Sequence, residues 1–241
     1  MYMLCFFVLM IILVLFRVLY DSKRVHITHD MVDDALTTAL ISACVYNTDE
    51  LALSGATVIY DTVTPVREPS YIISSITGQP ILDTTPYDTI NDEKLFSPGA
   101  DAYLNGAYQK FVRNLKQNLK LDDAMNSTIS GISGQVAITD FSVYNKFYNM
   151  DEDGNHTDFR IVKYTYSPGG WSAYPYGINS TASCYNSLDH SNYTVVETSV
   201  SACIAFDVVT GKHSDWAAPG LTEDDYRASV SYQRVVDITT Y

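Results

Sequence analysis

The first sixteen residues decide the fold: residues 1–16 read MYMLCFFVLMIILVLF and contain no charged side chain. After a single Arg17, residues 18–20 (VLY) continue the apolar run. About 20 residues, each rising 1.5 Å along a helix, cover the ~30 Å hydrocarbon core of a bilayer. The stretch therefore predicts one membrane-spanning helix at the N-terminus.

The same run is also compatible with the apolar part of a secretory signal peptide. No small-x-small cleavage site follows it, only YDSKR at residues 20–24, and no basic residue precedes it. A cleavable signal normally has both features. We therefore expect a retained anchor, with a cleaved leader as the alternative.

The charges near the run and the composition of the chain after it indicate opposite sides of the membrane for the large domain. Arg17, Lys23 and Arg24 lie after the span and nothing basic lies before it, so the positive-inside rule would place the large domain in the cytoplasm. The Tyr-, Thr- and Ser-rich strands that follow are instead typical of secreted domains. A true start site upstream of Met1, adding a basic leader, would reconcile the two, and we expect an extracytoplasmic C-terminal domain.

Length and charge limit the classes of function. The chain has 241 residues, which leaves enough beyond the apolar run for one domain with a sizeable core. It has 15 Lys+Arg against 28 Asp+Glu, a formal net charge of -13, and no basic stripe. This balance excludes nucleic acid as an expected partner, and no small-molecule substrate is predicted.

A second helical pattern follows the span, from Val25 to about Tyr46. Its apolar stripe consists of Val25, Val32, Leu36, Ala39, Leu40, Ala43 and Cys44. No Pro or Gly occurs before Gly55, so residues 1–47 are expected to form one rod, roughly 65 Å long at 1.5 Å per residue. The stripe can pack on the chain's own domain or between subunits, and the pattern leaves both open.

The two segments LFRVLYDSKR (residues 15–24) and VDDALTTALISA (residues 32–43) together resemble the TadE/TadG-like pilus-assembly proteins. In that family an apolar helix runs through a short Tyr/Arg stretch into an Ala-rich helix and a variable extracytoplasmic domain. The resemblance implies a bacterial, single-pass, pilin-like or pseudopilin-like subunit. Its partners would be the lipid bilayer and other pilus subunits, met through an assembly face of Val32, Leu36, Ala39 and Ala43.

Residues 48–241 are expected to form one acidic, β-rich domain that starts with mixed structure. A short strand is predicted at 55–60 and a long loop at 64–93, with a small strand near 71–74. Ser97 as N-cap and Pro98 at the first helical position predict a helix near 98–120. Its core-facing residues are Leu104, Tyr108, Phe111, Val112, Leu115 and Leu119.

Strands dominate the second half. They are predicted at residues 134–147, 158–166, 171–176, 195–209 and 228–239, with a hairpin turn at 151–155 between the first two. In 195–209 the side chains from Val196 to Val208 alternate between apolar and polar, and the apolar face is expected to pack on the helix near 98–120. A helix on an antiparallel sheet gives an α+β fold.

The four cysteines offer one candidate crosslink. Cys5 lies in the apolar run and Cys44 on the helical stripe, where a thiol behaves as a small apolar group. Cys184 and Cys203 lie in the outer β region, where a disulfide is plausible outside a cell. Two isolated thiols are the alternative.

Two segments have residues that can bind cations. Residues 149–157 (NMDEDGNHT) resemble a calcium loop, but the twelfth ligand position of an EF-hand would fall on Arg160, which cannot bind a cation. His26, His29 and Asp33 can share a helical face near the membrane, where polar residues are ordinary. We therefore predict no metal and no cofactor.

No nucleophile, zinc, phosphate-loop or dinucleotide motif occurs, so no catalytic residue is predicted and the chain is not expected to be an enzyme. Four Asn-x-Ser/Thr sites, at Asn126, Asn155, Asn179 and Asn192, would accept glycans in a eukaryotic secretory protein. The resemblance to a bacterial family favours the interpretation that these four Asn-x-Ser/Thr sites occur by chance.

The leading hypothesis is a pilin-like component of a Tad-type pilus or secretion apparatus. The alternative is a membrane-tethered binding or sensor domain that acts without assembly, with an envelope hydrolase as a remote third.

Overall fold

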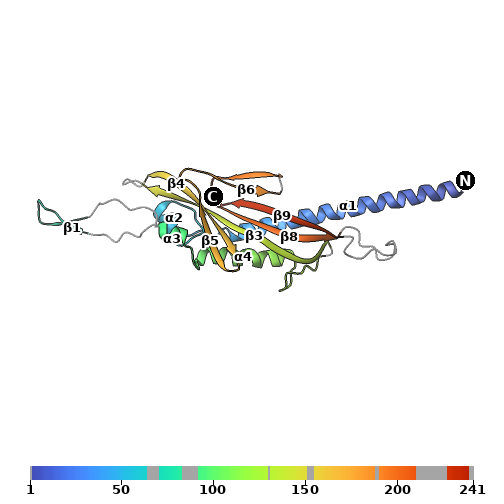
Figure 1. Cartoon of the computed structure of the whole chain (residues 1–241), viewed down its shortest axis with the longest axis horizontal. Coiled ribbons are helices and arrows are strands. Elements are labelled where there is room, and N and C mark those ends of the chain that lie inside the picture. Colours follow the sequence, from blue (N-terminus) through green and yellow to red (C-terminus); the bar gives the residue numbers. More distant parts are fainter. Residues whose placement is uncertain are drawn as a thin grey trace.

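The computed structural model describes residues 2–63, 71–82, 92–129, 131–150, 155–187, 190–209 and 227–238. The molecule is elongated, and its N-terminal helix projects from one end of a sheet domain (Figure 1). A five-stranded antiparallel sheet carries helices on one face and a small two-stranded sheet on the other. The predicted α+β fold agrees with this arrangement.

The predicted rod is a single helix, α1, Tyr2–Ala43. It is continuous because no Pro or Gly interrupts it. It ends three residues before the predicted Tyr46, because Asn47 caps a second helix, α2 (Thr48–Ser54), that the sequence did not predict. The Asn47 side chain accepts hydrogen bonds from the backbone N–H groups of Asp49 and Glu50, as an N-cap residue does.

The large sheet has the strand order β5-β4-β3-β8-β9. Its strands are β3 (Ile132–Met150), β4 (His156–Ser167), β5 (Gly170–Pro175), β8 (Ser199–Val209) and β9 (Arg227–Asp237). Strands predicted at 134–147, 158–166, 171–176 and 228–239 are confirmed. The strand predicted at 195–209 is confirmed from Ser199 onward; residues 196–198 are not strand, and the Thr198 hydroxyl accepts a hydrogen bond from Lys146 N–H at 3.0 Å.

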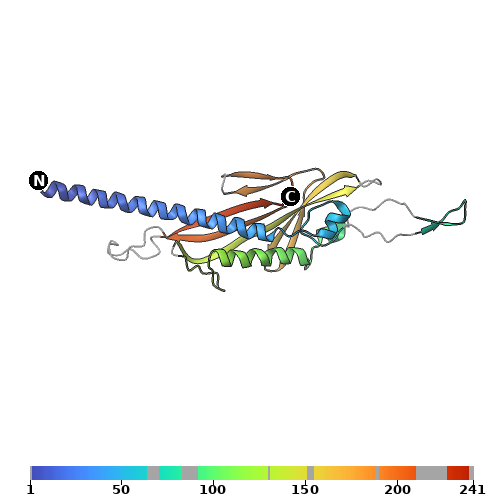
Figure 2. The same ribbon diagram turned by 180° about the vertical axis from the view of Figure 1, so that it is seen from behind.

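Two helices lie side by side on one face of the large sheet (Figure 2). The second half of α1 contacts β8 and β9. The other helix, α4 (Ala102–Asn118), packs through Phe111 on Phe141 of β3, with ring centroids 4.9 Å apart, and through Tyr108 on Tyr166 of β4, at 3.8 Å. The apolar face of β8 was predicted to pack on α4, and this was wrong in detail because α1 covers it.

The predicted start of α4 was also wrong. Ser97 and Pro98 lie between a short helix, α3 (Asp92–Phe96), and a turn at Gly99, whose φ is +56°. The N-cap is Asp101, whose carboxylate accepts hydrogen bonds from the N–H groups of Tyr103 and Leu104, both at 3.0 Å. The helix therefore begins four residues later than predicted from Ser97, because Asp101 caps it instead.

The small sheet on the opposite face was not predicted. It pairs β6 (Ala182–Asn186) with β7 (Ser191–Val195) and reaches β9 through the Ser187 N–H, which donates to the Gln233 carbonyl at 2.9 Å. A second apolar cluster fills the space between the two sheets. Its buried members are Tyr144, Ile161, Ala182, Cys184 and Val195.

Residues 55–60 do not form the predicted strand. They form an irregular segment. The buried Asn145 side chain of β3 pairs with the Ile59 backbone, accepting from its N–H at 2.7 Å and donating to its carbonyl at 3.0 Å. The strand predicted near 71–74 is confirmed as β1 (Tyr71–Ile73), which pairs with β2 (Pro80–Leu82) at the end of the molecule farthest from the N-terminus (Figure 1). Most of the predicted turn at 151–155 lies outside the described residues.

Candidate membrane anchor and the pockets beside it

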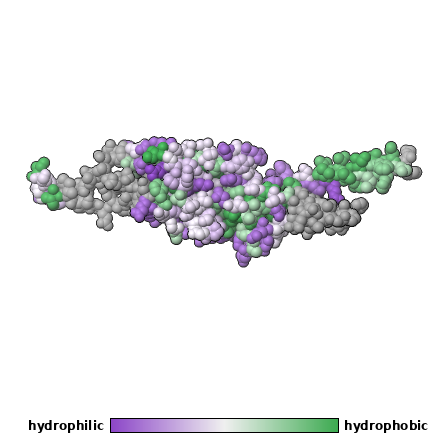
Figure 3. Space-filling view, in the orientation of Figure 1, coloured by the Kyte–Doolittle hydropathy of each residue, from purple (hydrophilic) through white to green (hydrophobic). Residues whose placement is uncertain are grey.

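The first half of α1 is long and apolar enough to cross a membrane, and none of that window is buried within the described chain. Leu9 and Phe16, for example, are 56% and 68% exposed. On the face that Figure 3 shows, the projecting part of the helix is mostly apolar. A patch this large is unfavourable in water, where apolar area costs about 25 cal/mol per Å², and it matches the hydrocarbon of a bilayer.

The character of α1 changes between Arg17 and Thr28. Arg17, Lys23 and Arg24, three of the 15 basic residues of the chain, fall within eight positions there. From Thr28 onward every third or fourth residue is buried against the sheet domain. The helix therefore passes from lipid-compatible surface through a basic segment into the protein core.

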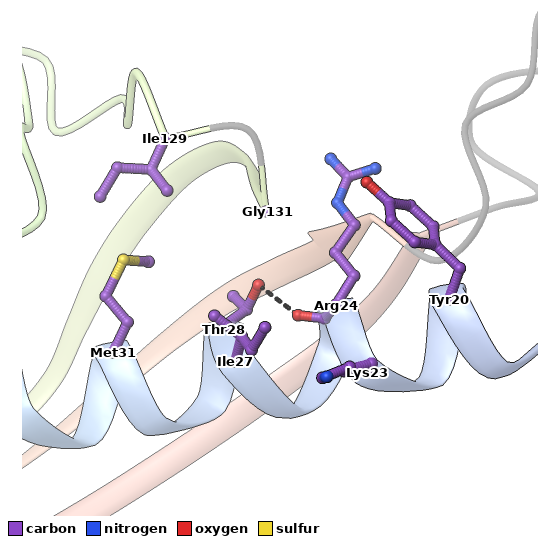
Figure 4. A pocket seen from close by; sticks show the side chains of 8 residues that line it. All are labelled: Tyr20, Lys23, Arg24, Ile27, Thr28, Met31, Ile129 and Gly131. Atoms are coloured by element: carbon purple, nitrogen blue, oxygen red, sulfur yellow. Dashed lines mark hydrogen bonds between the residues drawn. The ribbon is translucent and has the colours of Figure 1, made fainter.

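A pocket of about 220 Å³ lies against this basic segment (Figure 4). We call it the basic pocket; its lining residues are Tyr20, Lys23, Arg24, Ile27, Thr28, Met31, Ile129 and Gly131. Gly131 brings the start of β3 against the helix, since a Cβ there would lie 2.2 Å from the Thr28 hydroxyl oxygen. That hydroxyl donates to the Arg24 carbonyl at 3.0 Å, so the pocket floor is closed by protein contacts.

The predicted assembly face is used inside the molecule. Val32, Leu36, Ala39 and Ala43 are each 0% exposed and belong to the main core cluster with β8 and α4. They are therefore unavailable to a second subunit, and the reading in which the stripe packs on the chain's own domain is the correct one. Small Ala side chains in the stripe let α4 approach α1 closely, and Asn118 of α4 donates to the Ala35 carbonyl at 3.5 Å.

An ion pair ties α1 to the last strand. The Arg234 guanidinium donates from Nη2 to Asp33 Oδ2 at 2.8 Å. The two side chains are only 14% and 17% exposed, respectively. Because breaking a largely buried pair leaves an uncompensated charge, this contact fixes the helix against β9.

A second hollow, of about 440 Å³, lies on another side of α1, and we call it the histidine pocket. It is lined by His26, His29, Asp30, Asp33, Tyr185, Ser187, His190, Val230, Ser231 and Tyr232. His26 lies 3.8 Å from Asp30, whereas Asp33 is engaged by Arg234. Within the described residues, no three His, Cys, Asp or Glu side chains gather closely enough to hold a metal ion.

The predicted Cys184–Cys203 disulfide is not formed, and both thiols are free. Cys184 hydrogen-bonds Tyr144, which pairs with Ser199 on β8. Cys203 lies four residues farther along that strand, roughly 13 Å at 3.3 Å per residue, whereas a disulfide needs Cα atoms within about 7 Å. Cys203 instead contacts the Ser231 hydroxyl, with Sγ and Oγ 3.2 Å apart.

Burial controls the acidity of the groups between the two sheets. Desolvation raises the pKa of the Cys184 thiol to about 11. It also raises the pKa of Tyr193 to about 12, helped by a hydrogen bond from its hydroxyl to the Asp237 carboxylate. Ser199 donates to the other oxygen of that carboxylate at 2.5 Å. The small sheet is therefore held to the large one by a partly buried polar network as well as by apolar packing.

The calcium-like segment is not described at its candidate ligands, since residues 151–154 lie outside the described part. Next to it, the His156 ring stacks on Tyr148 at 4.0 Å and its Nε2 lies 2.8 Å from the Ser54 carbonyl oxygen. The four Asn residues of the Asn-x-Ser/Thr sites are all exposed. The side-chain amides of two of them donate hydrogen bonds to carboxylates, Asn179 to Asp158 and Asn126 to Asp122.

Comparisons of the chain with models of known protein families, with curated proteins and with solved structures gave no match. The TadE/TadG-like resemblance therefore stays a prediction from residues 15–43. What the structure adds is architectural: one exposed apolar half-helix, a basic segment, and a half-helix built into the core.

Sequence reasoning did not find the basic pocket. Tyr20, Lys23 and Arg24 drew attention only as flanking residues of the span, and Ile129 and Gly131 lie more than 100 positions away. A Gly beside a strand can mark a close backbone approach, but nothing in the sequence says which element approaches. Only the folded arrangement joins these two segments.

Proposed function

We propose that this chain is a membrane-anchored, pilin-like or pseudopilin-like subunit of a Tad-type pilus or secretion apparatus, with its acidic head outside the cytoplasmic membrane of a bacterium. The observation that carries the proposal is the division of α1 into an exposed apolar half and a half that completes the core of the head. The resemblance of residues 15–24 and 32–43 to the TadE/TadG-like proteins supports the same class. The role is structural, with no catalytic step.

The buried stripe leaves two surfaces of α1 for neighbouring subunits. One is the apolar half itself, which has no Gly, Ala or Ser before residue 21, so lateral packing there would use large side chains. The other is the outward face of the packed half, where Ile27 and Ile41 are 57% and 58% exposed. Subunits in a filament would meet along this line.

Cys5 gives a direct test, because it is the exposed one among the four cysteines of the chain, all of which lie in the described part. In a Cys203→Ser background, mild oxidation of intact cells should give disulfide-linked dimers through Cys5 if the apolar halves pack together. The Cys5→Ser variant should give none. A second probe, Ile41→Cys in the Cys5→Ser background, reports on the outward face.

If both probes give only monomers, and no other pilus protein is crosslinked to either position, helix-mediated assembly is wrong. Cys44 is a poor probe for this purpose. Its thiol donates to the Leu40 carbonyl at 3.3 Å, and burial raises its pKa to about 12, so little reactive thiolate is present.

One observation favours the alternative, a membrane-tethered binding or sensor domain that acts alone. The histidine pocket is a concave site of about 440 Å³ with polar and aromatic walls, as small-ligand sites have. Under this alternative a soluble small molecule should raise the melting temperature of the full-length chain, and substitution of His29 by Ala should remove that shift. Monomers in the crosslinking test together with such a ligand would favour the sensor.

A further inference from the structure

We propose that the histidine pocket is a strand-addition site, in which strand β1 of a second copy of this chain pairs with the edge of β9. The contact would join the heads of neighbouring subunits, so the proposal rests on the assembly role proposed above. It uses hydrogen bonds along the edge of the large sheet and does not involve the apolar half of α1.

The histidine pocket follows the edge of β9 rather than a face of the sheet. Three consecutive residues of that strand, Val230, Ser231 and Tyr232, line it, although neighbouring side chains of a strand point to opposite faces. The Tyr232 ring lies on the α1 side, 6.3 Å from the ring of His29. Helix α1 forms one wall and the β6–β7 hairpin forms the other. The pocket is therefore a groove with the edge of β9 as its floor.

The edge of β9 carries unpaired backbone groups beside this groove. The Gln233 N–H donates to the Ser187 hydroxyl at 2.8 Å, and the Gln233 carbonyl accepts from the Ser187 N–H at 2.9 Å. The backbone of Gln233 therefore points away from β8. Because this direction repeats at every second residue, the N–H and C=O groups of Ser231 and Ser229 also point outward. Within the described part of the chain they form no hydrogen bond, and both residues are exposed.

Strand β1 carries matching groups. In the β1–β2 hairpin the Ser74 N–H donates to the Gln79 carbonyl at 2.9 Å, so the backbone of Ser74 faces the partner strand. By the same alternation, the backbones of Ile73 and Tyr71 point away from β2. These two residues are two positions apart, as are the two outward serines of β9. The outer edge of β2 is a poorer donor, because Pro80, opposite Ile73, has no N–H.

The β1–β2 hairpin has little to pack on in its own head. Among the described elements, its two strands pack mainly on each other, and Ile73 and Ile76 are 67% and 92% exposed. A lone two-stranded hairpin is at best marginally stable in water, so a third strand would stabilise it. Residues 71–82 contain no charged side chain, although the chain has a formal net charge of -13. The hairpin can therefore approach another acidic head, and Asp30 in the groove wall, without repulsion.

The two matching edges lie at opposite ends of one molecule. Strand β9 begins at the end of the head from which α1 projects, whereas β1 lies at the far end (Figure 1). In this arrangement the β1 that enters the groove belongs to another copy, and the contact joins two copies head to tail. A heterologous contact that does not close into a ring gives an open filament, as expected for a pilin-like subunit.

Antiparallel pairing would satisfy the outward groups of both strands. With Ile73 opposite Ser229 and Tyr71 opposite Ser231, each pair of residues exchanges two N–H···O=C bonds. Main-chain bonds of this kind provide the affinity of strand addition, and the alternate side chains provide its specificity. The volume of about 440 Å³ lies within the range of about 300–1,000 Å³ for sites that enclose a drug-sized ligand, and a three-residue strand is of similar size.

Disulfide crosslinking of the full-length protein in intact cells tests the pairing. In a Cys5→Ser/Cys203→Ser background, Ile73→Cys and Ser229→Cys are introduced into the same chain. Both positions are exposed, so the fold should be unchanged. Opposite Cα atoms of a hydrogen-bonded antiparallel pair lie about 5.5 Å apart, which is within the range of a disulfide. Mild oxidation should therefore give a ladder of dimers, trimers and longer oligomers, whereas either substitution alone should give nothing beyond a dimer.

The matched control replaces Ser229→Cys by Ser172→Cys, an exposed position on β5 at the other edge of the same sheet. Oligomers beyond the dimer should be at least about tenfold fewer, because a disulfide needs Cα atoms within about 7 Å. Adding Tyr71→Pro to the Ile73→Cys/Ser229→Cys chain removes one outward N–H and should reduce the ladder at least about fivefold, the effect of one lost hydrogen bond.

Equal ladders with the two edge positions, or no oligomer beyond the dimer with Ser229→Cys, would overturn the proposal. Linkage of position 229 to a different protein without a ladder would also overturn it, since the groove would then take another partner. The helix probes at Cys5 and Ile41 report separately on assembly. Helix dimers without a ladder refute only the strand addition, whereas a ladder without helix dimers supports it and refutes packing along α1.

Discussion

Asp33 in α1 and Arg234 in β9 are separated by 201 positions of sequence, and their ion pair joins the N-terminal helix to the last strand of the sheet. We expect Arg234→Ala to lower the free energy of unfolding by about 3–5 kcal/mol, because Asp33 would be left largely buried without a counter-charge. Urea denaturation of the full-length protein in detergent measures the change.

A surface ion pair is the control for this prediction. Lys94 and Asp61 lie 2.9 Å apart but are 39% and 56% exposed, so Asp61→Asn should cost less than about 1 kcal/mol. Similar losses in the two variants would show that burial does not decide the strength of the Asp33–Arg234 pair. Replacing both partners, by Asp33→Leu and Arg234→Met, should cost less than Arg234→Ala alone.

Removing α1 should unfold the head. A fragment of residues 48–241 lacks Val32, Leu36 and Leu40, all 0% exposed, and burial of each contributes about 1.5–3 kcal/mol. Together with the rest of the stripe this approaches the 5–15 kcal/mol that stabilises a typical domain. The fragment should show no cooperative thermal transition by circular dichroism.

The control fragment, residues 21–241, keeps the packed half of α1 and loses only the exposed apolar half. It should fold cooperatively and remain soluble without detergent. If residues 48–241 melt as cooperatively and at the same temperature, the helix is a simple tether, and the sensor hypothesis gains support over the pilin-like one.

The three thiols outside the apolar run should differ in reactivity. Thiolate is the form that iodoacetamide attacks, and burial raises the pKa of Cys44 to about 12 and of Cys184 to about 11. At pH 8 we therefore expect Cys203 to be alkylated at least tenfold faster than either. Peptide mass spectrometry after timed labelling gives the three rates.

The same experiment under oxidising conditions tests the absence of a crosslink. We expect no disulfide between Cys184 and Cys203 in the folded protein, so the mass should not fall by two hydrogen atoms. Rapid labelling of Cys184, or its protection together with Cys203 until a reductant is added, would contradict the free-thiol arrangement.

Alkaline pH should destabilise the fold through its tyrosines. Desolvation first, and then nearby carboxylates, raises the pKa of Tyr193 and of Tyr232 to about 12, and burial also raises the pKa of Tyr164. An unfolded tyrosine titrates near pH 10. The folded state holds these protons more tightly, so their contribution to stability is complete below about pH 10 and is lost as the pH rises through 12.

Urea midpoints between pH 8 and 12, followed with the tyrosinate absorbance at 295 nm, check this expectation. The midpoint should fall only above pH 10, and buried tyrosines should ionise together with unfolding. Asp237→Asn removes one of the carboxylates and should move the ionisation of Tyr193 to lower pH. A midpoint that is flat to pH 12 would contradict the buried environment of these rings.

The sequence predicted those helices and strands whose own residues show a clear apolar run or a periodic pattern. An uninterrupted apolar and then amphipathic run gave α1, and period-two alternation gave β8 with a start four residues too early. Strand-forming residues between turn signals gave β3, β4 and β9 to within a few residues. The structure of 55–60 was missed because its hydrogen-bond partner is the side chain of Asn145. Likewise the stripe of Val32 and Leu36 shows that a face is buried, but not against which surface.

The pockets were missed for the same reason. Lys23 and Arg24 are an ordinary flank of a span until Gly131 brings the start of β3 against Thr28. A contact between residues more than 100 positions apart depends on the register of the sheet and on the crossing of α1 over it, and neither is encoded in a window of sequence.

The continuity of α1 has a mechanical consequence. Without Pro or Gly before residue 55, the helix has no break between its exposed apolar half and the half that packs in the core, so it acts as a lever arm held by the sheet. Its projecting part, some 23 residues, is about 35 Å long, and a tilt of about 10° moves its free end by about 6 Å. A force on the projecting half would thus be transmitted along the helix to β8 and β9, which α1 contacts.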